Sequence, residues 1–178
     1  MKIVGVDPSL SSTGVALADD TFATISTSAK GPKRLEAIRD QLLKLADGCD
    51  IVVIEGYSMG SHQGSHQLGE LGGVLRLALW EAGIPYVEVA PTRLKKWATG
   101  KGNAPKDQVL AKAARRWAGV SNNDEADAAW LRDMGCAHYV SSSLSKAHAD
   151  ILAQVDWPEL TPTAPMPWDS PTTQGAMT

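Results

Sequence analysis

The sequence predicts an α/β fold in which a five-stranded mixed sheet is flanked by helices. Two observations support this. Two runs of apolar, mostly β-branched residues each end in an acid, and three short strand-like segments follow one another with only short loops between them. After the third segment, helical and strand-like periodicities alternate, which is typical of α/β proteins.

The first 26 residues predict an antiparallel meander. Residues 2–7 form a β-branched run that ends in an acid and predicts a central strand, and residues 8–12 form a turn. Residues 13–18 predict a second strand, residues 19–20 a tight turn, and residues 21–26 a third strand. Because such short loops can join only antiparallel neighbours, these strands should pair in sequence order.

The rest of the chain alternates helices and strands. Gly31-Pro32 opens a helix that ends at Gly48, and residues 51–55 are a continuous apolar run, typical of a strand buried on both faces. The later elements are a helix over 67–81, a strand over 86–89, a helix from Pro91, a loop over 100–104, and helices over 105–117 and 124–137. This is the element order of the ribonuclease H-like fold, although other mixed α/β folds could produce it.

Length and composition predict one domain followed by a tail. The 178 residues favour a single domain, predicted over 1–150. Residues 157–178 are rich in Pro, Thr and Ser, cannot build a core, and are expected to be disordered. Cys49 and Cys136 lack metal-ligand spacing and are expected to be buried thiols in a reducing cytoplasm. The start of the chain lacks a signal-peptide pattern, which also predicts a cytoplasmic protein.

The basic residues are concentrated in one stretch. The chain has a net charge of -3, which argues against a nucleic-acid partner, yet eight bases and a single acid, Asp107, lie between Arg93 and Arg116. A local excess of positive charge determines phosphate attraction better than the global sum does. Lys101 and Lys106, in or beside the loop over 100–104, are predicted to hold a DNA backbone phosphate; the alternative is a solvated surface loop.

Four acids stand where they could form a metal site. Asp7 and Glu55 each lie at the carboxyl end of a predicted strand, where ligands of open α/β sheets gather. Asp124 and Asp127 are three residues apart on a helix and so face the same way, whereas Glu125 should point elsewhere as a solvated first-turn acid.

Converging carboxylates suit hard cations such as Mg²⁺, and two such ions about 4 Å apart stabilise attacking and leaving oxygens in phosphoryl transfer. Singly, each of these acids could equally be a turn former or a helix cap. That all four acids occur at these positions by coincidence is much less credible than that any one of them does.

Five segments of the sequence resemble the RuvC-type Holliday junction resolvases, a family with the ribonuclease H-like fold. They are GVDPSLSSTGVAL, VVIEGY, HQLGELGGVLRLAL, TGKGNAPKDQV and NNDEADAAWL. The resemblance spans residues 2–139 and is closer to phage-encoded than to bacterial members, because appended domains are absent and the tail diverges. It implies a homodimer that uses Mg²⁺ or Mn²⁺ and makes paired, symmetric nicks leaving 5′-phosphate ends.

The resemblance also implies roles for particular residues. The family's four metal-binding acids correspond to Asp7, Glu55, Asp124 and Asp127. Lys95 and Lys106 fall where the family places lysines near the scissile phosphate.

The chain departs from the family pattern after the second acid. An aromatic residue often follows three positions later, but that position is Ser58 here, and Tyr57 lies one residue earlier. Tyr57 could stack on a base at the crossover or pack locally. The sequence preference at the cut is therefore in doubt.

The helix over Gln67–Glu81 is apolar nearly all round, with leucines on more than one face. One face must cover the sheet, and the second predicts a homodimer contact; the alternative is a helix buried within its own subunit. Nearby, His62 and His66 are four residues apart but lack further zinc ligands, so they are expected to flank a cleft.

Three other functions compete with junction resolution. A broader branched-DNA or flap endonuclease would use the same chemistry. A sugar kinase or ATPase of the actin-like fold also opens with a strand ending in Asp, but needs a second lobe for which this chain is too short. A non-catalytic protein that binds DNA structures would not need four acids together, since they repel phosphate without metal.

Overall fold

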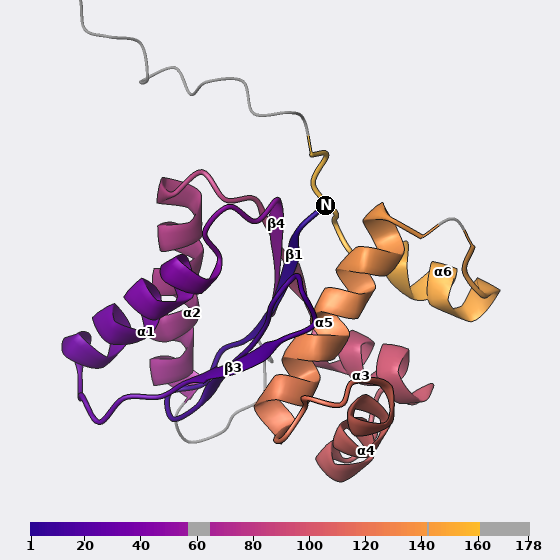
Figure 1. Cartoon of the computed structure of the whole chain (residues 1–178), viewed down its shortest axis with the longest axis horizontal. Coiled ribbons are helices and arrows are strands. Elements are labelled where there is room, and N and C mark those ends of the chain that lie inside the picture. The colour runs from indigo at the N-terminus through magenta and orange to yellow at the C-terminus, as the bar shows by residue number, and fades with distance from the viewer. Residues whose placement is uncertain (57–64, 142, 161–178) are drawn as a thin grey trace, which may run out of the picture.

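The computed structural model describes residues 1–56, 65–141 and 143–160 (Figure 1). Its elements, in chain order, are β1 (Ile3–Asp7), β2 (Thr13–Ala16), β3 (Phe22–Ile25), α1 (Pro32–Leu45), β4 (Ile51–Glu55), α2 (Ser65–Glu81), β5 (Tyr86–Val89), α3 (Pro91–Thr99), α4 (Lys106–Arg116), α5 (Asn123–Tyr139) and α6 (Lys146–Leu152). The sequence predicted each of these except α6. Within the described residues, no helix is long and apolar enough to cross a membrane.

The five strands form one mixed sheet in the order β3-β2-β1-β4-β5. The predicted meander is confirmed, because β2 pairs antiparallel with both β1 and β3. β4 pairs in parallel with β1 and with β5, and the register sets Val6 opposite Ile54. The next residue on each strand is an acid, so Asp7 and Glu55 end side by side at the same edge of the sheet.

Helices cover both faces of the sheet and divide the core in two. On one face α1 and α2 pack over Val4, Val6 and Ile54. On the other, α5 crosses the sheet with α3, α4 and α6 beside it, over Ile3 and Val53 (Figure 1). Alternate residues of a strand point to opposite faces of the sheet. Asp7 lies four residues after Ile3, and Glu55 lies two residues after Val53, so both acids point to the α5 side.

Glycines let α5 lie unusually close to the sheet. A Cβ atom added at Gly5 of β1 would overlap the carbonyl oxygen of Ala128, and one added at Gly14 of β2 would overlap that of Asp124. On the helix side, a Cβ at Gly135 would come within 2.8 Å of methyl groups of Ile3 and Val53. The contact between α5 and the strands is therefore a backbone contact at several points along the helix.

The segment that follows α5 packs against α3 and α5 over more residues than the sequence predicted. The rings of Trp157 and His138 stack with centroids 4.5 Å apart, and the Tyr139 hydroxyl donates a 2.8 Å hydrogen bond to the carbonyl of Pro158. In α6, His148 lies against Trp97 of α3, with ring centroids 4.2 Å apart. The packed region thus extends through 157–160, where disorder was predicted, and the rest of the tail lies outside the described residues.

The glycine contacts yield the first prediction. Replacing Gly14 with alanine should push the start of α5 off β2 and lower the free energy of unfolding by about 1–3 kcal/mol or more, as overpacking does. Chemical denaturation measures this loss. Lys33→Ala, at an exposed position in the first turn of α1, is the control, because a surface substitution that removes no packing contact changes stability by less than about 0.5 kcal/mol. Equal stability of the two variants would contradict the close-approach argument.

Candidate active site

The four predicted acids come from three elements that meet at one edge of the sheet. Asp7 and Glu55 end the parallel neighbours β1 and β4, and Asp124 and Asp127 lie in the first turns of α5. Asp7 and Asp127 are only 6% and 7% exposed, while Glu55 and Asp124 are half-buried. Buried carboxylates are rare unless they are paired or bind a cation.

The carboxyl groups perturb one another strongly. Burial raises the pKa of Asp7 well above its ordinary value, and the neighbouring Glu55, Asp127 and Asp124 raise it further. The pKa of Asp127 is raised to about 7, first by burial and then by Glu55. The pKa of Glu55 is also raised by burial, although it shares a hydrogen bond with Asp7. These acids are near enough to compete for protons, which is the electrostatic situation that a cation relieves.

The donor set fits a hard divalent cation. It consists of carboxylate oxygens, which Mg²⁺, Mn²⁺ and Ca²⁺ prefer, and it contains no thiol or imidazole. Within the described ranges, no three of these side chains already form a ready coordination shell. Like charges repel until protons or cations neutralise them, so these carboxyl groups would draw closer together around a bound cation.

The start of α5 is fixed by a capping arrangement that corrects one prediction. Asn122 is the N-cap, and its side chain accepts a 2.9 Å hydrogen bond from the backbone N–H of Glu125. In return the Glu125 carboxylate accepts bonds from the Ser121 backbone N–H (2.9 Å) and hydroxyl (2.7 Å), and from the Thr24 hydroxyl (2.9 Å).

Glu125 is thus 7% exposed and not the solvated acid that the sequence suggested. Burial opposes its ionisation, but the hydrogen bonds from Ser121 and Thr24 outweigh that effect and lower its pKa. The spacing Asn-x-x-Glu at 122–125 is a capping-box pattern and could have revealed this role from the sequence.

A second polar contact of the site was not predicted. The Ser12 hydroxyl, in the loop between β1 and β2, donates a hydrogen bond to the Asp124 carboxylate. These residues are 112 positions apart, so the sequence shows only a serine-rich turn after Asp7. The contact ties the loop that follows one acid to the helix that carries another.

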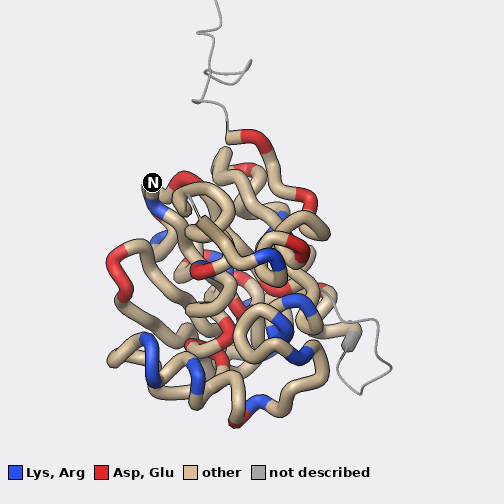
Figure 2. The backbone as a smooth tube through the Cα atoms, turned by 90° about the vertical axis from the view of Figure 1, so that its right-hand side faces the viewer, with Lys and Arg blue, Asp and Glu red and all other residues tan. Residues whose placement is uncertain are grey.

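Basic side chains lie beside the acids, on α3 and α4. Lys95 and Lys106 are close enough to oppose the rise in pKa of both Glu55 and Asp127. In Figure 2 most of the blue segments lie in the lower half of the molecule, the level of α3 and α4 in Figure 1, while the top near the C-terminal segment is red. Lys101 is exposed in the loop between these helices.

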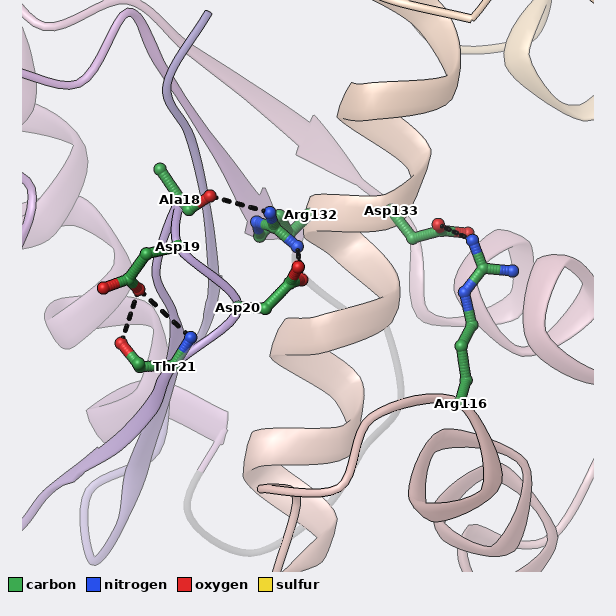
Figure 3. A network of polar contacts seen from close by, with 7 residues as sticks. All are labelled: Ala18, Asp19, Asp20, Thr21, Arg116, Arg132 and Asp133. Carbon is green, nitrogen blue, oxygen red and sulfur yellow. Dashed lines mark hydrogen bonds and ion pairs between the residues drawn. The ribbon is translucent and has the colours of Figure 1, made fainter.

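Asp133 of α5 holds the two basic helices in place. Its carboxylate accepts hydrogen bonds from the Trp97 indole of α3 (2.8 Å) and from Arg116 at the end of α4 (2.6 Å; Figure 3). Trp97 is 5% exposed and Trp117 is half-buried, so both are packing residues. The helix that carries two of the acids therefore also positions the lysines.

Tyr57, Ser58 and His62 lie outside the described residues, and His66 is exposed. Cys49 and Cys136 are free thiols, but both are half-buried and not fully buried as predicted.

A family model for the crossover junction endodeoxyribonuclease RuvC matches residues 3–130. The chain belongs to the RuvC family. RuvC of Ruegeria pomeroyi is 29% identical over 86% of this chain and 100% of its own length. RuvC of Gloeobacter violaceus is 30% identical over 83% of this chain and 94% of its own.

Solved RuvC structures share the fold. Thermus thermophilus RuvC in complex with a Holliday junction substrate superposes with a TM-score of 0.62 at 21% identity, covering 74% of this chain and 90% of that one. A second structure of Thermus thermophilus RuvC gives a TM-score of 0.59 at 22% identity, with 74% and 91% covered. Dependence on divalent metal is typical of the RuvC family, in agreement with the all-carboxylate donor set, and the match excludes the actin-like kinase alternative.

The raised pKa values predict an unusual pH dependence of stability without metal. A folded pKa of about 7 at Asp127 gives stability that is fully present below its unfolded value, about 4, and is lost as the pH rises through 7. Asp7 and Glu55 act in the same direction. In a chelator, the melting temperature should therefore fall between about pH 5 and pH 8.

Two further measurements test whether the acids of the site cause this fall in melting temperature. Asp127→Asn should flatten the fall, because the amide does not titrate, and Mg²⁺ should restore more stability at pH 8 than at pH 5. A fall in melting temperature that is as steep for Asp127→Asn as for the native chain would contradict the raised pKa of Asp127.

Proposed function

We propose that this chain is a structure-selective endodeoxyribonuclease that resolves four-way DNA junctions by divalent-metal-dependent hydrolysis of phosphodiester bonds. One observation carries the proposal: Asp7, Glu55, Asp124 and Asp127 meet at one sheet edge, beside Lys95 and Lys106. The names of the RuvC relatives, and the junction bound to the Thermus thermophilus protein, support this substrate class. Such a protein would act in the cytoplasm of a bacterium or of a phage-infected host.

The acids would hold Mg²⁺, with Mn²⁺ able to substitute and two ions per site. Bound there, the ions would activate the attacking water and stabilise the leaving 3′ oxygen, so that the products carry 5′-phosphates. The burial of Asp7 and Asp127 keeps bulk water from competing for the ions. Ser12 orients the carboxylate of Asp124 through its hydrogen bond.

The basic side chains would bind the DNA backbone. Lys95 and Lys106 lie beside the acids and would hold the phosphate to be cut, and Lys101 would contact the same strand from the neighbouring loop. Their positive charge would also offset the repulsion between phosphate and carboxylates. Tyr57 would meet the bases at the crossover or pack locally, the two possibilities that its position in the sequence leaves open.

Paired cutting requires two sites, and α2 offers a surface for a homodimer. Leu77 and Trp80 are 54% and 60% exposed, and Gly73 is also exposed, one helical turn before Leu77. The opposite side of α2 packs in the core through Leu71, Leu75 and Leu79, so both apolar faces that the sequence predicted are present. A twofold dimer formed here would set one active site against each of two opposed strands of a junction.

A cleavage assay on four substrates tests the proposal. A four-way junction labelled on two opposed strands, a flap, a fork and a linear duplex would be incubated with the full chain, with and without Mg²⁺. We expect cutting only with metal, fastest on the junction, with both labelled strands nicked. Equal rates on flap and fork would favour the broader branched-DNA nuclease, and nicks confined to one strand would contradict the dimer.

Asp7→Asn and Glu55→Gln should reduce junction cutting on the order of a hundredfold or more, because each removes a metal ligand. Gel-shift assays should show junction binding retained, since the basic surface is intact. Glu36→Gln, an exposed acid on α1, is the control and should cut normally. Normal cutting by either site variant would refute the metal assignment, whereas absence of cutting by the native chain would favour a non-catalytic binder.

Lys106→Ala should weaken junction binding and reduce the slope of log Kd against log salt by about 1, because one phosphate contact is lost. Lys44→Ala, in the last turn of α1, serves as the charge-matched control and should leave the slope unchanged. An unchanged slope for Lys106→Ala would remove this lysine from the DNA interface.

A further inference from the structure

The first turn of α5 is held from three directions by polar contacts. The Ser12 hydroxyl reaches the Asp124 carboxylate from the β1–β2 loop. Thr24, on the edge strand β3, donates its hydroxyl to Oε1 of Glu125, 2.9 Å away. Ser121, just before the helix, donates its backbone N–H and its hydroxyl to Oε2 of the same carboxylate.

The Glu125 carboxylate therefore bridges two segments with its two oxygens. Thr24 is 101 residues away in sequence, so this bond joins α5 to the sheet and not only to its own cap. The side chain of Asn122 adds to the same cluster, donating to the Thr24 hydroxyl at 3.2 Å. Glu125 lies between two of the acids in sequence, so movement of this turn would move both of them.

The turn needs such a restraint because of the charges it carries. Asp124 and Asp127 face Asp7 and Glu55, and like charges at this distance repel when no cation lies between them. On the other side, Gly14 lies directly against the backbone of Asp124, so the helix end cannot move closer to β2 but could move away. A bond from Glu125 to β3 opposes outward movement.

We propose that Thr24, Ser121 and Glu125 form a latch that holds the first turn of α5 against the sheet before metal binds, with Glu125 as a positioning residue. The proposal rests on the proposed metal site. It predicts that the latch raises metal affinity, because a site already assembled against its own repulsion spends less of the binding free energy on ordering the ligands. It assigns no direct contact with metal or DNA to Glu125.

Thr24→Val tests the latch with little disturbance of the strand, since valine keeps the β-branched shape and lacks the hydroxyl. Binding of Mn²⁺ to the full chain, without DNA, is measured by electron paramagnetic resonance. We expect affinity to fall by about tenfold, because the variant loses the hydrogen bond to the Glu125 carboxylate and the acceptor for the Asn122 side chain. Thr24→Ser keeps the hydroxyl and should bind as the native chain does, and Glu125→Gln should weaken binding in the same direction.

Thr21→Val is the matched control. Thr21 lies in the same hairpin and donates its hydroxyl to the Asp19 carboxylate at 2.6 Å (Figure 3). It lies at the turn end of the hairpin, whereas Thr24 pairs with Gly14, which contacts the start of α5. This variant should bind Mn²⁺ with native affinity.

The possible results separate the latch from the metal site itself. Native Mn²⁺ affinity for Thr24→Val would overturn the latch, even if that variant melted at a lower temperature. Equal weakening by Thr21→Val would overturn it too, because any loosened hairpin would then have the same effect. A native chain that binds no Mn²⁺ would instead overturn the proposed metal site.

Discussion

The backbone contact between α5 and strands β1 and β2 is the constraint on which the rest of the site depends. At Gly5 and Gly14 no side chain separates the strand from α5, so the backbone of Asp124 lies directly against β2. A larger residue at either position would lift the helix away. Two of the four acids would then leave the edge at which the other two end, and no rearrangement of side chains could compensate.

The same helix links acids and bases, which have opposite electrostatic requirements. Asp7 and Asp127 are buried and near like charges, an arrangement that disfavours their ionised forms. Lys95 and Lys106 relieve part of that effect, and Asp133 fixes the helices that carry them. A negatively charged substrate would thus meet basic groups beside an acidic centre, an arrangement that suits phosphate binding once cations are present.

Much of the fold could be predicted from local patterns. The strand–turn–strand spacing of the first 26 residues indicated the meander, and the acids that end residues 3–7 and 51–55 indicated one edge of the site. The helix α6 was missed because its seven residues carry too little periodicity to predict a helix. Trp157 was assigned to a disordered tail because the composition of residues 157–178 is that of a linker. In the structure its ring stacks on the ring of His138.

The sequence by itself determined which residues are acids, their positions at strand ends and on one helix face, and the family of the chain. Strand alternation and helical periodicity are short-range rules, so they can be read from neighbouring positions. Only the tertiary structure decided that Glu125 is buried on Thr24, that Ser12 holds Asp124, and that the acids perturb one another's protonation. These contacts join residues that are distant in the chain, and their strength depends on burial, which exists only once the chain has folded.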